Sequence, residues 1–156
     1  MTKKWENYED VAVYLLNQFS DKFGLDSVSG KQTVPGEITK TNWEIDGKGI
    51  RSEDGAIIIV ECKRHLKSKQ NQEVLGGLSY RIIDSGAAGG ILVSPLGFQK
   101  GAKLVAEANN IMQVQLNSNS TNSEYLIRFL KNVCIGLVDS LEVRATVTGI
   151  FLTKVQ

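Results

Sequence analysis

The sequence AIIIVECK, residues 56–63, decides how this chain folds. Its opening run is apolar at every position and mostly β-branched, which predicts a central strand covered on both faces. Side chains alternate between the two faces of a strand, so we expect Glu61 and Lys63 on one side and Cys62 on the other. The strand therefore ends with a carboxylate and an ammonium group that point the same way.

The residues before this strand predict a hairpin. Residues 43–46 (WEID) begin an earlier strand, and residues 52–55 (SEDG) carry an Asp-Gly pair typical of a tight turn. A turn at that point leads the chain directly into the apolar strand. This arrangement can gather Asp46, Glu61 and Lys63 around a single point.

Helices and strands alternate in the rest of the chain. From the spacing of apolar residues and the turn signals we expect a helix over 8–23, a weak strand over 26–34, a helix over 71–84, a strand over 90–94, a helix over 99–110 and a strand over 111–116. Strands separated by helices need crossover connections and run parallel, whereas the Asp-Gly hairpin is antiparallel. The sequence therefore predicts an α/β fold with a mixed β-sheet core flanked by helices.

The C-terminal part of the chain has a different pattern. We expect a core over residues 1–116, a polar loop over 117–123 and a short C-terminal extension over 124–156. Within the extension, residues 123–137 have helical spacing and residues 143–152 have strand character. About 30 residues are too few for an independent domain, so we expect the extension to pack on the core or on a second subunit.

The composition agrees with one globular domain, with 156 residues, 42% hydrophobic, and a formal net charge of +1. Such a charge neither demands nor excludes a nucleic-acid partner. The chain has two cysteines, Cys62 and Cys134, and its first residues are not followed by an apolar segment, which argues against secretion and a disulfide framework. No apolar run approaches the roughly 20 residues of a membrane-spanning helix, so we expect a cytoplasmic protein.

An acid–x–lysine tripeptide is common by chance, and its ordinary interpretation is a surface ion pair worth roughly 0 to 1 kcal/mol. Here it follows an apolar strand, where an unpaired carboxylate is costly unless water or a cation serves it. Two carboxylates, those of Asp46 and Glu61, are enough protein to hold Mg²⁺ while waters and phosphate oxygens complete its shell. Lys63 can hold a water or stabilise charge on phosphoryl oxygens. These residues favour metal-dependent phosphodiester hydrolysis.

The same residues resemble the restriction endonuclease-like superfamily with the PD-(D/E)xK motif, and specifically its Mrr-like restriction endonuclease domains. The resemblance covers about Tyr8 to Leu116. It rests on the leading helix with Glu9, on IDG at 45–47, on VECKR at 60–64, and on GILVS at 90–94 followed by Gly97-Phe98. The motif begins with Ile-Asp here, where the family pattern has Pro-Asp.

The resemblance implies an αβββαβ-type core and a Mg²⁺-dependent DNA endonuclease, with Mn²⁺ able to substitute. In the family the Asp and the Glu bind the metal, the Lys positions or polarises the attacking water, and a first-helix Glu often completes the site. These roles fall here on Asp46, Glu61, Lys63 and Glu9. Nucleases of this family often carry a polar residue that opens the next helix, where Gln70 and Gln72 stand here, and this adds Gln72 to the candidate catalytic residues. Both glutamines could equally be ordinary helix-start residues.

Three further groups of residues near the motif have assignable roles. The backbone carbonyl of Cys62 can add a metal ligand, whereas its thiol is best explained as core packing. Asp54 competes with Asp46 as the first acid, but an Asp in a hairpin is more often a turn former. The most basic local stretch can contact DNA phosphates or form a solvated loop, and it comprises Arg64, His65, Lys67 and Lys69.

Two other functions remain open at the level of sequence. One is a structure-selective nuclease such as a Holliday junction resolvase, and the other is a non-catalytic nucleic-acid-binding or assembly subunit with the same fold. A pure binding module has no need of two acids that repel phosphate, which favours the nuclease. Symmetric cutting of double-stranded or branched DNA requires two active sites, so we expect a homodimer.

Overall fold

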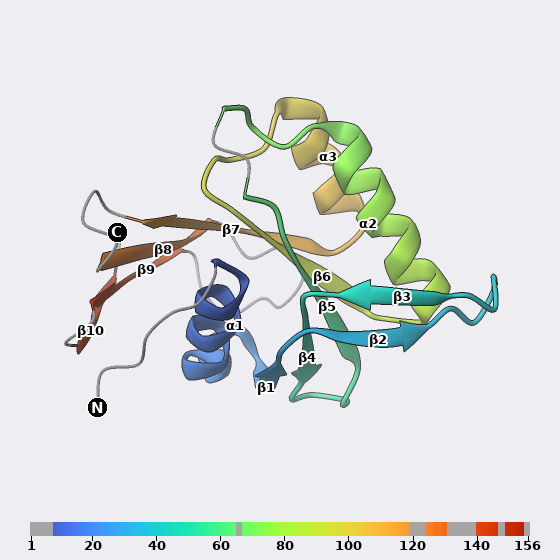
Figure 1. Ribbon diagram of the computed structural model, residues 1–156, viewed down its shortest axis with the longest axis horizontal. Helices are drawn as coiled ribbons and strands as arrows, with labels where there is room; N and C mark the ends of the chain where they lie inside the picture. Colours follow the sequence, from blue (N-terminus) through green and yellow to red (C-terminus); the bar gives the residue numbers. More distant parts are fainter. Residues whose placement is uncertain (1–7, 65–66, 119–123, 131–139, 147–148, 155–156) are drawn as a thin grey trace.

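Figure 1 shows a computed structural model with one large sheet, helices on both of its faces and a small two-stranded sheet beside it. The structure describes residues 8–64, 67–118, 124–130, 140–146 and 149–154. The large sheet has the strand order β1-β4-β5-β6-β7-β8-β9-β10, and β2 pairs with β3 in the small sheet. The pairs β5–β6 and β6–β7 are parallel and the others antiparallel, which confirms the predicted mixed α/β fold.

The elements lie close to their predicted positions up to the end of β7. In chain order they are α1 (Tyr8–Gln18), a 3-10 helix (Ser20–Phe23), β1 (Leu25–Ser29), β2 (Gln32–Pro35), β3 (Asn42–Ile45), β4 (Gly47–Arg51), β5 (Ile57–Cys62), α2 (Gln72–Ser85), β6 (Gly89–Ser94), α3 (Lys100–Ala108), β7 (Ile111–Ser118), β8 (Glu124–Leu130), β9 (Ser140–Thr146) and β10 (Gly149–Lys154). The predicted first helix is shorter than expected, because its last turn tightens into the 3-10 helix. The weak strand expected over 26–34 is divided between β1 and β2.

Strand β5 is the centre of the core, as its apolar run predicts. It pairs antiparallel with β4 on one side and parallel with β6 on the other. Ile58 and Val60 pack in a cluster with α1, whereas Ile59 packs in a second cluster with α2 and α3, and all three are at most 1% exposed. Figure 1 shows the same division, with α1 on one face of the sheet and α2 and α3 on the other. Both faces of β5 are therefore shielded from solvent at these residues.

The turn between β4 and β5 is the predicted hairpin. Gly55 has a φ of 72°, a left-handed conformation that glycine adopts without strain. Asp54 accepts hydrogen bonds from the Arg51 side chain and from the Ala56 amide. These hydrogen bonds lower the pKa of Asp54 to about 2, and the bond from Arg51 has the largest effect. Asp54 is therefore a turn former, as the hairpin pattern indicates.

The β2–β3 hairpin is held against the end of α2 by the carboxylate of Asp84. This side chain is fully buried. Its Oδ1 accepts from the backbone amides of Ile38 and Thr39, and its Oδ2 accepts from the Thr39 hydroxyl at 2.5 Å and from Trp43 Nε1 at 2.7 Å. A Cβ on Gly36 would come within 2.3 Å of Oδ2, so the close approach requires glycine there. The hairpin and α2 thus share one buried anion.

The C-terminal strands extend the sheet beyond β7. The helix predicted over 123–137 is wrong for residues 124–130, which form β8 and pair antiparallel with β7. A strand there satisfies the backbone groups along the edge of β7, which a helix leaves unpaired. Residues 131–139 lie outside the described part of the chain. The strand character predicted over 143–152 is confirmed for its described residues, 143–146 and 149–152, by the antiparallel pair β9–β10, and residues 147–148 lie outside the described part of the chain.

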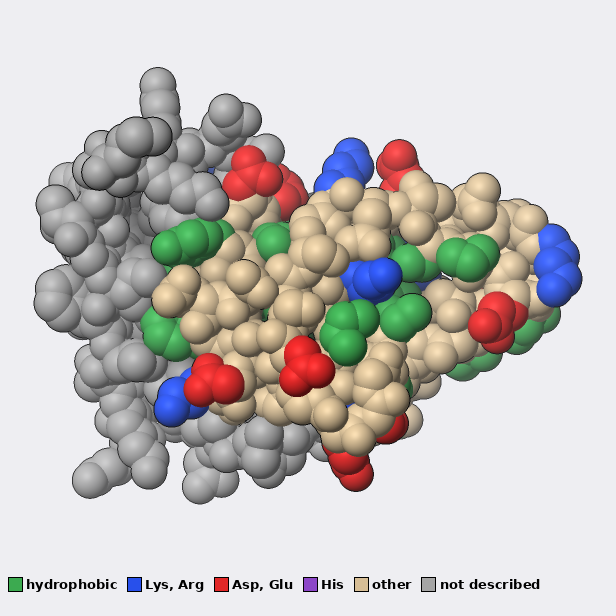
Figure 2. Space-filling view, turned by 90° about the horizontal axis from the view of Figure 1, so that it is seen from below, with side chains coloured by type: hydrophobic (Ala, Val, Ile, Leu, Met, Phe, Trp, Pro, Cys, Tyr) green, Lys and Arg blue, Asp and Glu red, His purple; other side chains and the backbone are tan. Residues whose placement is uncertain are grey.

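Among the described residues, a search of the helices for a candidate membrane span finds none. Figure 2 shows the molecule from below, the side away from the β5–α2 loop at the top of Figure 1. On that face, acidic and basic side chains of the described residues are dispersed among hydrophobic and polar atoms. Charge of one sign is not concentrated there, in keeping with the net charge of +1.

Replacing Asp84 with asparagine should destabilise the fold, because an amide nitrogen would face donors that now bind a carboxylate. Burial by itself raises the pKa of Asp84, but the hydrogen bonds from Thr39, Trp43 and Ile38 outweigh it and lower the pKa from 3.8 to about 2. The ionised group therefore stabilises the fold above about pH 4, and this contribution is lost as the pH falls through about 2. Urea unfolding should show a lower midpoint for Asp84→Asn at neutral pH.

The gap between wild type and Asp84→Asn should shrink as the pH falls from about 4 to about 2. Asp26→Asn, which alters an exposed carboxylate, is the matched control and should leave the midpoint nearly unchanged. Equal midpoints for wild type and Asp84→Asn at neutral pH would contradict a stabilising role for the buried anion.

Candidate active site

The candidate site lies where β4 begins and β5 ends. Asp46 is the residue between β3 and β4, and its amide donates to the Val60 carbonyl at 3.2 Å. The carboxylate returns to the same strand, because its Oδ2 accepts from the Cys62 amide at 2.8 Å. Backbone hydrogen bonds therefore hold Asp46 beside the strand that carries Glu61.

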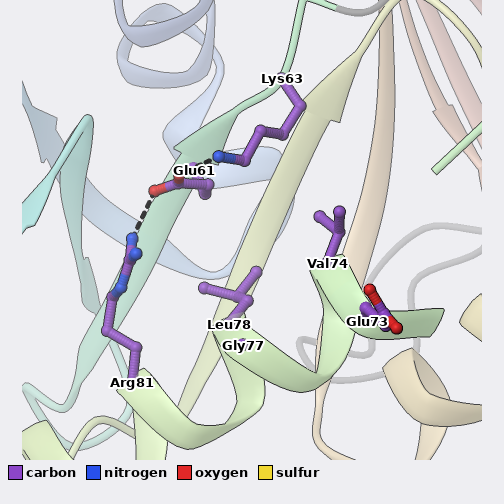
Figure 3. Close-up of a pocket in the computed structure, with 7 residues that line it drawn as sticks. All are labelled: Glu61, Lys63, Glu73, Val74, Gly77, Leu78 and Arg81. Carbon is purple, nitrogen blue, oxygen red and sulfur yellow. Dashed lines mark hydrogen bonds and ion pairs between the residues drawn. The ribbon is translucent and has the colours of Figure 1, made fainter. Parts of the chain in front are cut away.

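Glu61 is the most constrained charged group in this region. It is only 9% exposed, and its two carboxylate oxygens contact different cations. Lys63 Nζ lies 3.0 Å from Oε1, and Arg81 Nη1 lies 2.6 Å from Oε2. Figure 3 shows Lys63 and Arg81 approaching Glu61 from opposite ends, one from the end of β5 and the other from α2. The buried charge of Glu61 is thus compensated on both sides.

The two faces of the strand end are used as the alternation predicts. Glu61 and Lys63 form an ion pair on the α2 side, while Cys62 belongs to the cluster that packs against α1. Glu61 and Lys63 also line a pocket of about 200 Å³, whose other lining residues are Glu73, Val74, Gly77, Leu78 and Arg81. A Cβ on Gly77 would meet no other atom within 4 Å, so the pocket is open on the α2 side at this residue.

Arg81 is the site residue that the sequence analysis missed. It lies 20 residues after Glu61, on the helix that crosses over between parallel strands. Its guanidinium also lies over the ring of Trp43, 5.4 Å from the ring centroid. The sequence signal that could have identified Arg81 is a basic residue beside the apolar helix positions Leu78 and Ile82. That pattern is common on surface helices and so does not single Arg81 out.

The pKa of the Cys62 thiol depends on its burial and on the charges around it. Burial is the main cause that raises the pKa of Cys62, and the carboxylates of Asp46, Glu9 and Glu61 raise it further. These carboxylates belong to Glu9 on α1, to Asp46 just before β4 and to Glu61 on β5. Glu9 is half-buried on α1.

The basic loop after β5 lies next to this site. Arg64, Lys67 and Lys69 are exposed, and the Arg64 guanidinium lies 5.9 Å from the centroid of the Tyr8 ring. His65 is outside the described residues. Exposed ammonium and guanidinium groups of this kind are available to phosphate oxygens.

Gln72 lies apart from the acids. It is exposed in the first turn of α2, and its Oε1 lies 2.7 Å from the position of a Cβ on Gly101. It lines a neighbouring hollow with Asn71 and Gln99; Glu73 lines both this hollow and the Glu61 pocket, but Gln72 does not line the latter. A direct catalytic role for Gln72 stays a prediction that this geometry does not support.

The donor set of the site fits a hard cation. Asp46 and Glu61 supply carboxylate oxygens, which are the ligands that Mg²⁺ and Mn²⁺ prefer. Each oxygen of Glu61 has a second lone pair beyond the one used by Lys63 or Arg81. Within the described ranges, His, Cys, Asp and Glu side chains form no group of three or more that could hold a metal ion. A cation here would keep several waters or bind phosphate oxygens.

The fold and the site together define a class of protein. An acid at the start of one strand, an acid–x–lysine pair at the end of its neighbour and helices on both sheet faces are features of nucleases with the restriction endonuclease-like fold. A family comparison agrees: the model of the Mrr catalytic domain, described as restriction endonuclease, matches residues 30–121. The chain belongs to this family.

Comparison with one solved structure supports the fold. The crystal structure of a protein of unknown function, AF1548, aligns with a TM-score of 0.54 and 20% sequence identity, covering 65% of this chain and 55% of that chain. A repair endonuclease from Pyrococcus abyssi aligns with a TM-score of 0.45 and 22% identity, covering 71% of this chain and 47% of that chain. This chain therefore spans about half the length of these structures. A search of curated proteins finds no significant match.

Cys62 should react slowly with thiol reagents in the native protein, because it is 7% exposed and its raised pKa keeps the thiol protonated. In a Cys134→Ser background at neutral pH, we expect modification to be more than about 10-fold slower in the folded protein than in urea. Equal rates in the two states would show that the native thiol is as accessible and as readily ionised as in the unfolded chain, against the packing assignment.

Proposed function

We propose that this chain is a divalent-metal-dependent DNA endonuclease that hydrolyses phosphodiester bonds, with Mg²⁺ as the cofactor and Mn²⁺ as a substitute. The observation that supports it best is the hydrogen bond from the Cys62 amide to Asp46, which brings the first acid to the strand end where Glu61 and Lys63 are paired. Family membership supports the same reaction, because restriction endonucleases usually use divalent metals.

Each residue of the site has a separate task in this proposal. Asp46 and Glu61 would hold the cation, and Glu9 would complete the acidic set from α1. The bound cation would screen the negative charge of the scissile phosphate. Lys63 has a side chain that is 36% exposed, so its ammonium group can leave Glu61 and contact a water or a phosphoryl oxygen.

The surroundings of the site suit a polyanionic substrate. The pocket is small, and its lining carries two carboxylates, Glu61 and Glu73, together with two cationic groups, Lys63 and Arg81. The partly exposed ammonium group of Lys63 is available to a phosphate oxygen. The exposed side chains of Arg64, Lys67 and Lys69 lie on the loop that joins the site to α2. Their contacts would be to the DNA backbone and would position the substrate without reading its sequence.

Purified wild-type protein should cleave DNA only when Mg²⁺ or Mn²⁺ is present. Asp46→Asn, Glu61→Gln and Lys63→Met should each lower kcat by about 10²- to 10³-fold, because each removes a charge aimed at the reacting phosphate. Glu53→Gln, which changes an exposed turn acid, is the control and should cleave like wild type. Thermal melting of every variant checks that it is folded.

Supercoiled, linear, single-stranded and branched DNA form the substrate panel for this assay. A strong preference for branched DNA would assign the site to junction cleavage, whereas cutting of linear duplex would favour a restriction-type activity. Folded wild-type protein that cleaves none of these with either metal would refute the nuclease proposal.

Removing Lys67 or Lys69 should weaken DNA binding to a similar extent for all sequences, since phosphate contacts carry no sequence information. Each substitution by alanine should reduce the slope of log K against log salt concentration by about 1. Fluorescence anisotropy in a Glu61→Gln background measures binding without cleavage. Lys22→Ala, an exposed lysine of the 3-10 helix, is the control. An unchanged salt slope in both loop variants would place the DNA elsewhere.

A further inference from the structure

The contact between Arg81 and Glu61 joins a helix to the candidate cation ligand. Arg81 Nη1 lies 2.6 Å from Glu61 Oε2, and both side chains are largely buried, at 21% and 11% exposure. A charged hydrogen bond of this length is among the stronger polar contacts in proteins. It orients the carboxylate, because Oε2 is held from the α2 side while Oε1 faces Lys63.

Arg81 is itself braced by an aromatic ring. Its guanidinium lies 5.4 Å from the centroid of the Trp43 ring, and Tyr80 meets the same ring edge-on with centroids 6.3 Å apart. Trp43 is fixed in turn by the hydrogen bond from its Nε1 to the buried carboxylate of Asp84. A continuous series of contacts therefore runs from Asp84 through Trp43 and Arg81 to Glu61.

One nitrogen of Arg81 is left without a partner in this arrangement. Its Nε is buried, and no hydrogen-bond acceptor for it lies among the described residues. Leaving a buried donor unpaired is costly, so the surroundings must hold the guanidinium in place for another reason. The stacking on Trp43 and the bond to Glu61 are the two contacts that do so.

We propose that Arg81 is a positioning residue for the site: braced on Trp43, it fixes the orientation of the Glu61 carboxylate that would hold the divalent cation. The inference rests on the proposed function, because it assigns a partner to the cation ligand of that reaction. Arg81 contacts neither the cation nor the substrate in this role. Residues that orient a metal ligand typically contribute about 10- to 100-fold to metal affinity or activity.

A purely electrostatic role for Arg81 predicts the opposite result. A guanidinium beside a cation site repels the cation, so its removal would strengthen cation binding. Positioning predicts weaker binding when Arg81 is lost, because Lys63 alone then holds one oxygen and the carboxylate can rotate about that contact. The sign of the change in affinity therefore separates the two roles.

Mn²⁺ binding to the DNA-free protein tests the proposal directly, with free Mn²⁺ measured by electron paramagnetic resonance. We expect Arg81→Met to weaken binding by about 10- to 100-fold. Arg81→Lys should restore only part of the affinity, because lysine keeps the charge but lacks the planar group that stacks on Trp43. Arg51→Met removes the arginine of an ion pair at the far end of β4 and should bind like wild type.

Thermal melting shows whether each variant is folded. If Arg81→Met does not fold, Trp43→Phe provides the test instead. This variant keeps Arg81 but removes the hydrogen bond to Asp84, so it should weaken Mn²⁺ binding in the same direction by a smaller factor. In cleavage assays, Arg81→Met should lower kcat and leave the KM for DNA near that of wild type.

Unchanged or tighter Mn²⁺ binding by folded Arg81→Met would overturn the inference. If wild type cleaves DNA and Arg81→Met binds Mn²⁺ and cleaves equally well, the positioning role fails while the nuclease proposal stands. If wild type cleaves no DNA yet Mn²⁺ binding depends on both Glu61 and Arg81, the nuclease proposal fails while Arg81 remains the residue that orients a cation ligand.

Discussion

A carboxylate at the end of a strand that is buried on both faces is the constraint on which this structure depends. Glu61 is 9% exposed, and the free energy of an unpaired charge in such a place is prohibitive for a small domain. The chain meets this requirement with two cations from different elements, Lys63 on the same strand and Arg81 on α2. The packing of α2 across β5 is therefore linked to the charge balance of the site.

Buried ion pairs of this kind do not simply add stability. The cost of removing both partners from water offsets much of their attraction, whereas loss of one partner leaves an uncompensated charge. Their value here is specificity of arrangement: Lys63 and Arg81 hold opposite oxygens of one carboxylate, so its plane is defined. In the proposed reaction, a cation ligand that is already oriented does not have to be ordered when cation and phosphate bind.

The sequence predicted the elements of the core well, because their signals are local. The apolar run of β5, the Asp54-Gly55 turn and the left-handed Gly86 that ends α2 are each specified by a few neighbouring residues. Residues 124–130 were predicted as helix because their apolar positions also fit helical spacing. They form β8, since the edge of β7 offers backbone hydrogen bonds that no local pattern records.

The sequence by itself determined that Glu61 and Lys63 share one side of a strand and that Cys62 faces the other, because alternation is a property of the extended backbone. Only the tertiary structure decided that Arg81 reaches Glu61, 20 residues earlier, and that Asp84 binds Trp43, 41 residues earlier. Contacts over such separations depend on how a crossover helix and a hairpin pack on the sheet. That packing is set by the whole core, and a short motif carries no information about it.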